Sequence, residues 1–122
     1  AFTAFAALGE ETVFANNLVS RCGSGFQLPE QPEGRKIVLR DNAISEVSIG
    51  ILSSGGTVEA ACNAVWKAKH PFIERNGAKI LRAGLVTADP KFRDAARGDY
   101  RLSAGSPLLG AGTAGRNIGL YQ

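Results

Sequence analysis

Three short segments of the chain share one alternation of apolar and polar positions, and each is centred on an asparagine. The asparagines are Asn17, Asn42 and Asn63, separated by 25 and 21 residues. Around each of them apolar residues alternate with polar or small ones, which is the pattern of β-strands with one buried face. A repeat of this length is typical of one turn of a β-solenoid, so we expect each segment to form a coil that stacks on the next.

The alignment places apolar residues in columns that should point into the solenoid. These columns are Thr12, Ile37 and Val58; Phe14, Leu39 and Ala60; and Val19, Ile44 and Val65. Eight residues after each asparagine, Gly25, Gly50 and Pro71 each precede a large apolar residue, which predicts a turn and then a second strand in every coil. The asparagines should stack as a structural ladder, because an amide both donates and accepts hydrogen bonds. We favour this ladder over a ligand-binding role for them.

The last third of the chain, residues 88–122, differs because Gly and Pro interrupt every apolar run. It contains Asp89-Pro90-Lys91-Phe92, Gly98-Asp99-Tyr100-Arg101-Leu102, Gly105-Ser106-Pro107 and Ile118-Gly119-Leu120-Tyr121. This order of motifs resembles the closing segment of right-handed parallel β-helix proteins of the pectate-lyase-like type. The chain departs from that pattern at Asn117, Leu120 and Leu108-Leu109, where the family usually has Asp, Ala and Ala-Ile.

The resemblance implies an all-β, right-handed, single-stranded parallel β-helix. We expect one domain over residues 1–122, with four to five coils in residues 1–87 and the closing segment in 88–122. Phe2 and Phe5 are spaced as the last strand of a preceding coil, which would make the chain part of a longer protein. A short capping helix at this end is the alternative. Asn76-Gly77 predicts a hairpin, because it is the preferred dipeptide of a two-residue hairpin loop.

Charge and composition narrow the class of partner. The 122 residues carry a net charge of +3 and contain no basic run. This mild excess fits an acidic polysaccharide or no particular partner, and it is too small to indicate nucleic acid. No apolar stretch approaches the roughly 18 residues of a membrane span.

Cys22 and Cys62 fall in different columns two coils apart, about 10 Å at one strand spacing per coil, so we expect two free thiols.

The candidate binding residues are those that a groove for an acidic sugar would use. In the family that the chain resembles, lyases use an Arg or Lys as base, often with calcium, and hydrolases use paired Asp. Arg40 lies on the outer face between small neighbours, where its guanidinium is placed to bind a sugar carboxylate. Trp66, Lys67, Lys69 and His70 combine the single tryptophan with the densest basic patch. The simpler interpretation of these residues is a contact face and a solvated turn.

No catalytic residue follows from the sequence. Asp89, Asp94 and Asp99 recur at intervals of five, but the Pro after Asp89 and the Gly before Asp99 are typical of turns. The single His70 and two cysteines leave no Cys/His set for zinc. We therefore predict no metal site and no resident cofactor, with calcium left open.

Two hypotheses for the function follow, from different classes. The first is a structural or interaction module, associated with carbohydrate, that self-associates through its open end or an apolar outer face. The second is the C-terminal part of a polysaccharide lyase or glycoside hydrolase that acts on an acidic polysaccharide. Both imply a polysaccharide partner, contact with a second copy or with upstream coils, and an extracellular, periplasmic or cell-surface location. The outer face in question carries Val13, Val38, Glu59, Ala15, Arg40 and Ala61.

Overall fold

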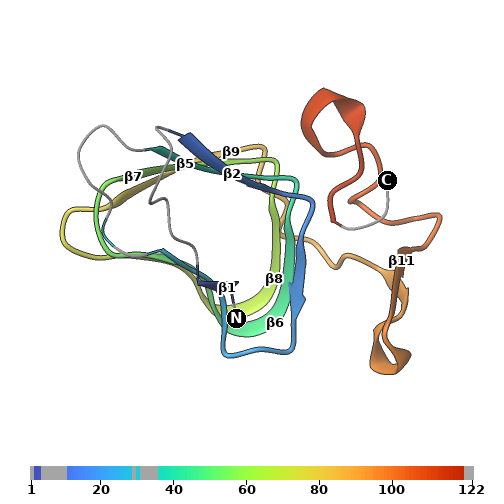
Figure 1. The fold of residues 1–122 in the computed structure, drawn as a ribbon. Coiled ribbons are helices and arrows are strands. Elements are labelled where there is room, and N and C mark those ends of the chain that lie inside the picture. Colours follow the sequence, from blue (N-terminus) through green and yellow to red (C-terminus); the bar gives the residue numbers. More distant parts are fainter. Residues whose placement is uncertain (1, 4–10, 29, 31–35, 120–122) are drawn as a thin grey trace.

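The structure, a computed structural model, describes residues 2–3, 11–28, 30 and 36–119. These residues form a parallel β-solenoid of about three turns with a tail beside it (Figure 1). The elements are β1 (Phe2–Thr3), β2 (Glu11–Ala15), β3 (Leu18–Ser20), β4 (Ser24–Leu28), β5 (Lys36–Arg40), β6 (Ala43–Ser53), β7 (Thr57–Ala61), β8 (Ala64–Glu74), β9 (Lys79–Ala83), β10 (Phe92–Asp94), η1 (Ala95–Arg97), β11 (Asp99–Leu102) and η2 (Thr113–Gly115). The two η elements are 3₁₀ helices of three residues each, so the predicted all-β solenoid is confirmed.

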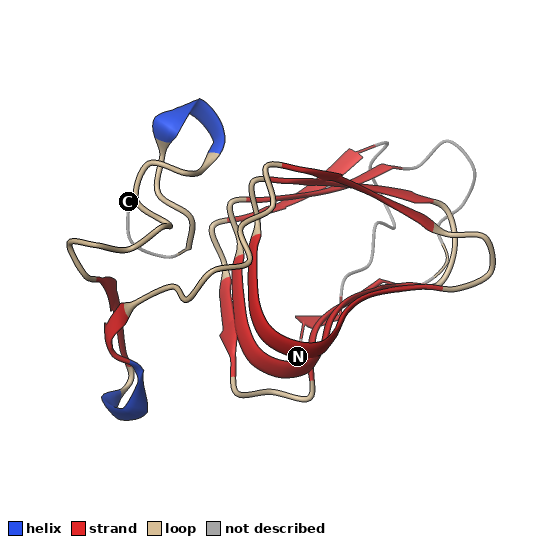
Figure 2. Ribbon diagram, turned by 180° about the vertical axis from the view of Figure 1, so that it is seen from behind, coloured by secondary structure: helices blue, strands red, loops and turns tan. Residues whose placement is uncertain are grey.

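Two parallel sheets make up the coils. One has the strand order β2-β5-β7-β9. In the other, β6 pairs on one side with β3 and then β4, and on its other side with β8, while β1 pairs with β4. Seen from behind, the strands of successive coils nest against one another along their length (Figure 2).

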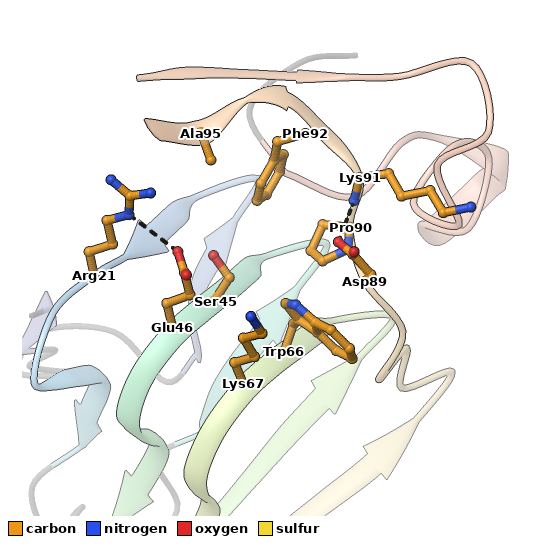
Figure 3. Close-up of a pocket in the computed structure, with 10 residues that line it drawn as sticks. All are labelled: Arg21, Ser45, Glu46, Trp66, Lys67, Asp89, Pro90, Lys91, Phe92 and Ala95. Carbon is orange, nitrogen blue, oxygen red and sulfur yellow. Dashed lines mark hydrogen bonds and ion pairs between the residues drawn. The ribbon is translucent and has the colours of Figure 1, made fainter. Parts of the chain in front are cut away.

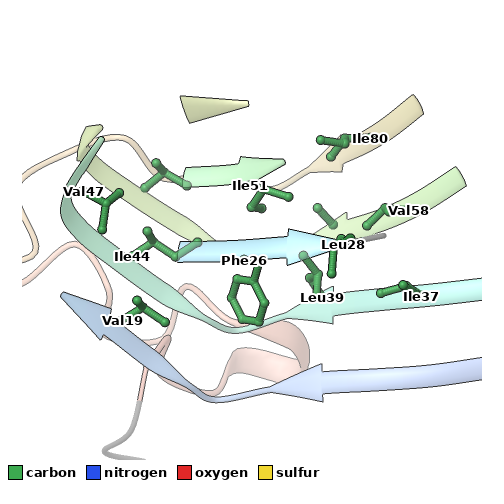
Figure 4. Packing of buried hydrophobic residues seen from close by; sticks show 12 residues of the cluster. Val19, Phe26, Leu28, Ile37, Leu39, Ile44, Val47, Ile51, Val58 and Ile80 are labelled. Carbon is green, nitrogen blue, oxygen red and sulfur yellow. The ribbon is translucent and has the colours of Figure 1, made fainter. Parts of the chain in front are cut away.

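The pairing register confirms the alignment made on the asparagines. Phe14 pairs with Leu39, and Leu39 pairs with Ala60. The other inward columns are in register as well, and their side chains fill the interior (Figure 4). The buried core contains Val19, Phe26, Leu28, Ile37, Leu39, Ile44, Val47, Ile51, Val58, Ala60, Val65 and Ile80. Since a slip of one residue would turn each column outward, burial on one face fixes this register.

The expected turn eight residues after each asparagine is wrong in all three coils, because Gly25 lies inside β4 and the other two residues also lie inside strands. Gly50 and Pro71 lie inside β6 and β8, which are continuous strands of 11 residues each. The left-handed residues fall earlier, at Glu46 and Lys67, where φ is 54° and 52°. Gly25 serves close stacking instead, because a Cβ there would lie 2.4 Å from the carbonyl oxygen of Gly50.

The expected four to five coils are also too many, because the solenoid ends at β9. Beyond β9 a single isolated bridge joins Val86 to Ala64 among the described residues, and the chain then leaves the coils. In the register Arg82 follows Ala60, so a charged residue stands where an inward column would continue. Its guanidinium carbon lies 4.0 Å from the centroid of the Phe72 ring. A charge in this position disfavours the pairing of a further strand.

Two local predictions have different outcomes. β1 pairs in parallel with β4, with Phe2 opposite Phe26, so Phe2–Thr3 is a strand of a preceding coil; Phe5 lies outside the described residues.

The predicted hairpin at Asn76-Gly77 is wrong. Both residues have positive φ, 54° and 75°, as its turn type requires, but they connect β8 to β9, which belong to different sheets. The turn therefore makes a corner of the solenoid.

The three asparagines form a ladder along one corner. The Nδ2 of Asn17 donates to Oδ1 of Asn42 at 3.0 Å, and the Nδ2 of Asn42 donates to Oδ1 of Asn63 at 3.0 Å. The same Oδ1 atoms also accept the backbone N–H of the preceding asparagine, at 3.0 Å for Asn17 and 3.1 Å for Asn42. Asn42 and Asn63 are buried, so these bonds compensate for amide groups that have lost water.

The tail packs against the outside of the solenoid, as Figures 1 and 2 both show. Leu108 and Ile118, both fully buried, contact Ala43 and Ala64, which directly follow two of the ladder asparagines. The tail thus covers a different outer face from the one considered above. On that other face Val13 is 45 % exposed, and Leu81, which extends it, is 50 % exposed.

Candidate functional site

The candidate site begins at a corner four residues after each ladder asparagine. Arg21, Glu46 and Lys67 occupy it, and all three have left-handed backbone, with φ of 55°, 54° and 52°. Stacking of the coils therefore aligns a positive, a negative and a positive side chain along the solenoid. The Nε of Arg21 lies 3.2 Å from Oε2 of Glu46, and both side chains are largely exposed.

The tail passes this corner and encloses a cavity of about 240 Å³, which we call the tail groove (Figure 3). Its lining residues are Arg21, Ser45, Glu46, Trp66 and Lys67 from the solenoid and Asp89, Pro90, Lys91, Phe92 and Ala95 from the tail. The tail wall is fixed by Ser106, whose Oγ donates to the carbonyl of Pro90 at 2.6 Å. The volume is slightly below that of typical small-molecule sites, so it suits one unit of a chain whose remainder lies outside.

Trp66 lies at one edge of the tail groove, beside Lys67 and next to the Asp89-Pro90 segment (Figure 3). The register sets it opposite Ser45, whose hydroxyl is 2.9 Å from that of Ser20 on the coil before. The preceding coils carry only these small side chains in its column, and the indole is partly exposed. An aromatic face of this kind stacks readily on an apolar surface of a ligand.

The charges of the tail groove are unequally engaged. Glu46 is paired with Arg21, and Oδ1 of Asp89 accepts the backbone N–H of Lys91 at 2.9 Å. Lys67 is exposed and forms no ion pair with any described residue. The side chain of Lys91 runs away from Trp66 in Figure 3. Lys67 is therefore the ammonium that stands beside the ring and is open to an anion.

The structure brings together only two of the five candidate sugar-binding residues. Trp66 and Lys67 line the tail groove, whereas Lys69 and His70, exposed on the same strand, do not. Arg40 lies at the other corner, where its NH1 donates to Oδ2 of Asp41 at 3.0 Å. It thus helps to hold a buried carboxylate instead of standing open on the surface.

Asp41 fastens the tail to the solenoid and was not singled out by the sequence. It is 0 % exposed, and its Oδ1 accepts the backbone N–H of Thr113 at 2.7 Å. Its Oδ2 accepts the Thr113 hydroxyl at 2.5 Å, and its backbone carbonyl accepts the N–H of Gly119 at 2.8 Å. No local pattern signals these bonds, since Thr113 lies 72 residues away in the sequence.

The three aspartates of the tail are each held by a neighbour. Asp89 makes the turn described above, and Asp94 pairs with Arg97 at 3.5 Å. Asp99 accepts two hydrogen bonds from the Arg101 side chain, at 2.9 and 2.8 Å. These bonds, together with a backbone hydrogen bond and the positive charge of Arg101, lower the pKa of Asp99 to about 2. It is ionised at neutral pH and does not serve as a proton donor there.

The part of the chain that the structure describes contains neither a cluster of metal ligands nor a membrane-spanning helix. No three or more His, Cys, Asp or Glu side chains of this part come together as metal ligands would. None of its helices is long and apolar enough to cross a membrane. Cys22 and Cys62 are both free thiols.

The sequence could have indicated one side of the tail groove but not the other. Extending the alignment to the fourth position after each asparagine would have collected Arg21 and Glu46 with Lys67. The tail wall depends on where residues 89–95 dock, which no periodicity reveals. No protein-family model, curated protein or solved structure matches the chain significantly.

Proposed function

We propose that this protein is a carbohydrate-binding β-helix module that holds one unit of an acidic polysaccharide in the tail groove. The observation that carries the proposal is the pairing of Trp66 with Lys67, an ammonium without an ion-pair partner among the described residues, in a cavity of about 240 Å³. The resemblance to pectate-lyase-like proteins supports a polysaccharide as the ligand and an extracellular, periplasmic or cell-surface location.

Each groove residue has a role in this proposal. The indole of Trp66 stacks on the apolar face of a sugar ring, because its large apolar surface gains from being shielded from water. The ammonium of Lys67 binds the carboxylate of the same or an adjacent unit, which makes an acidic glycan bind more tightly than a neutral one. Lys67 is exposed at the rim of the groove, so in this proposal the rest of the ligand chain continues out of the cavity past it.

Binding is preferred to turnover because the acidic groups of the groove are engaged. Glu46 is paired with Arg21, and Asp89 accepts a backbone N–H. The alternative, a lyase or hydrolase that acts on an acidic polysaccharide, would use Lys67 as its base. It is tested in the same experiment.

The experiment measures binding to a polyuronate, its methyl-esterified form and a neutral glucan, each with and without calcium. We expect saturable binding to the polyuronate alone, weakened about tenfold by Lys67→Gln, or about 1.4 kcal/mol. Lys69→Gln is the matched control, because it removes the same charge two residues along the strand and outside the groove. Equal affinity of the two variants would refute the proposal, and release of new reducing ends would replace it with the enzyme hypothesis.

A second candidate is self-association through the outer face of β2, β5, β7 and β9. It is favoured by the exposure of Val13 and Leu81, two large apolar side chains on that face. Sedimentation of the wild type and of Leu81→Lys tests it. A dimer that is lost in the variant supports self-association, and a monomer at every concentration rejects it.

A further inference from the structure

The ladder of asparagines has a direction, so its two ends differ. In the middle, Asn42 donates its Nδ2 to the Oδ1 of Asn63 on the next coil and to the carbonyl of Phe14 on the preceding coil, at 3.0 Å in both cases. Its own Oδ1 accepts two N–H groups from Asn17 of the preceding coil. Each asparagine therefore needs a coil on both sides to make its full set of bonds.

Asn17, at the N-terminal end of the ladder, has this set on one side only. Its bonds run to Asn42 and to the backbone N–H of Ala43. Its Oδ1 and its second amide hydrogen have no partner among the described residues, although the equivalent atoms of Asn42 are both bonded. These two groups match the donors and the carbonyl that another asparagine-bearing coil would present.

The strands beside Asn17 show the same one-sided state. Among the residues that the structure describes, β2 and β3 are the edge strands of their sheets and pair with β5 and β6 alone. Phe14 is partly exposed, whereas Leu39 in the same inward column is fully buried. The preceding coil is already represented by β1, which pairs with β4 and places Phe2 opposite Phe26. A further coil at this edge would therefore lie in the same layer as β1, which already pairs with β4.

The C-terminal end of the ladder is built differently. The bridge between Ala64 and Val86 sets Leu85 beside Asn63, so an apolar side chain occupies the next ladder position. Arg82 stands at the end of an inward column, and it is held there by a hydrogen bond of 3.2 Å to Oε1 of Glu74. Neither residue can supply what Asn17 lacks. Head-to-tail stacking of two copies is therefore disfavoured.

We propose that the edge formed by β2, Asn17 and β3 is a docking surface for a further coil of the same repeat. That coil is a pair of parallel strands joined by a corner that carries an asparagine. Its amide N–H groups would donate to Oδ1 of Asn17, and the carbonyl three residues before its asparagine would accept from Nδ2 of Asn17. This surface is separate from the tail groove, so it does not depend on the glycan proposal.

The test supplies such a coil by a graft. A copy of residues 36–49, which contains Asn42, is placed directly ahead of Ala1. Because Phe2 and Ile51 both align with Phe26, Ala1 then takes the place of Gly50 and the graft continues into β1 in register. The matched control is the same graft with leucine at its asparagine, since Leu85 occupies that position at the other end of the ladder.

The asparagine graft should raise the melting temperature by at least about 4 °C. In a domain of this size a modest gain in stability produces a shift of that order. It should also slow hydrogen exchange of the β2 and β3 amides that point away from β5 and β6. The leucine graft should give less than half of either effect. Equal effects of the two grafts, or none, would overturn the proposal. So would a wild-type dimer that the asparagine graft abolishes, because the occupant of the edge would then be a second copy.

Discussion

The residues just before the ladder asparagines and the residues four positions after them have the same left-handed backbone. The φ angles are 56°, 58° and 55° at Asn16, Asp41 and Cys62, and 55°, 54° and 52° at Arg21, Glu46 and Lys67. The first corner is covered by the tail, and Asp41 in it is 0 % exposed. At the second corner the side chain of Lys67 is exposed beside Trp66. One backbone geometry thus supports a buried fastening at one corner and an open groove at the other.

The difference lies in what offsets the cost of the left-handed backbone. That conformation costs about 1–2 kcal/mol for each residue other than glycine. At the first corner hydrogen bonds compensate, through Asp41 to Thr113 and through Asn16 to the carbonyl of Gly119. Lys67 makes no ion pair with a described residue, so no ion pair offsets that cost. Glycine would adopt this backbone with less strain than lysine does. Strained backbone of this kind clusters at functional sites, which fits a binding role for Lys67.

The largest effect is expected at the ladder that separates the two corners. Asn42→Ala removes the acceptor of two N–H groups and the donor to two oxygens at a buried site. Buried groups left without partners should lower the free energy of unfolding by about 3–5 kcal/mol. Urea denaturation measures this. Asn76→Gly, at an exposed asparagine whose left-handed backbone glycine also adopts, should cost less than about 1 kcal/mol, and a similar loss for both would refute the ladder's role.

Asp41→Gly tests the first corner. It relieves the left-handed backbone but removes the carboxylate that binds Thr113 and Arg40, so a net loss of about 2–4 kcal/mol is expected. The tail should become accessible to protease while the coils stay folded. A tail that remains protected would show that Leu108 and Ile118 suffice to hold it.

Lys67→Gly makes the same substitution at the second corner and should separate stability from binding. Relief of the backbone is offset by the greater freedom of the unfolded chain, so the free energy of unfolding should change by less than about 0.5 kcal/mol. Affinity for a polyuronate should fall about tenfold. A destabilisation as large as that of Asp41→Gly would erase the difference between the corners.

The smallest effect is expected for Glu46→Gln. The pair that Glu46 forms with Arg21 is exposed, so its loss should change stability by less than about 0.5 kcal/mol. Removal of a negative charge from the groove should strengthen polyuronate binding roughly twofold at low salt. The gain should vanish in high salt. Weaker binding would mean that Glu46 contacts the sugar directly.

The coils could be predicted from the sequence because their information is local and periodic. The asparagines and the alternation around Phe14, Leu39 and Ala60 define a register that burial then enforces. The number of coils could not be predicted, because it depends on Arg82 ending an inward column and on the chain leaving the solenoid after Val86. The fastening by Asp41 was missed for a related reason. A bond across 72 residues leaves no spacing to detect.

The candidate site was half visible for the same reasons. Trp66 and Lys67 could be selected by their chemistry, since a single tryptophan stands beside a basic patch. Lys69 and His70 could not be separated from them, because only the docked tail defines which part of β8 lines the groove. Arg40 looked open in the alignment, and its bond to Asp41 depends on a carboxylate that the tail buries.

The most direct test of the account is a titration of the intrinsic fluorescence with an acidic oligosaccharide. Trp66 is the only tryptophan, so fluorescence excited at wavelengths that the two tyrosines do not absorb comes from the tail groove alone. The account predicts a saturable change that weakens about tenfold in Lys67→Gly and is unaltered in Lys69→Gln. A flat titration, or the same curve for wild type and Lys67→Gly, would contradict the claim that the second corner is a binding site.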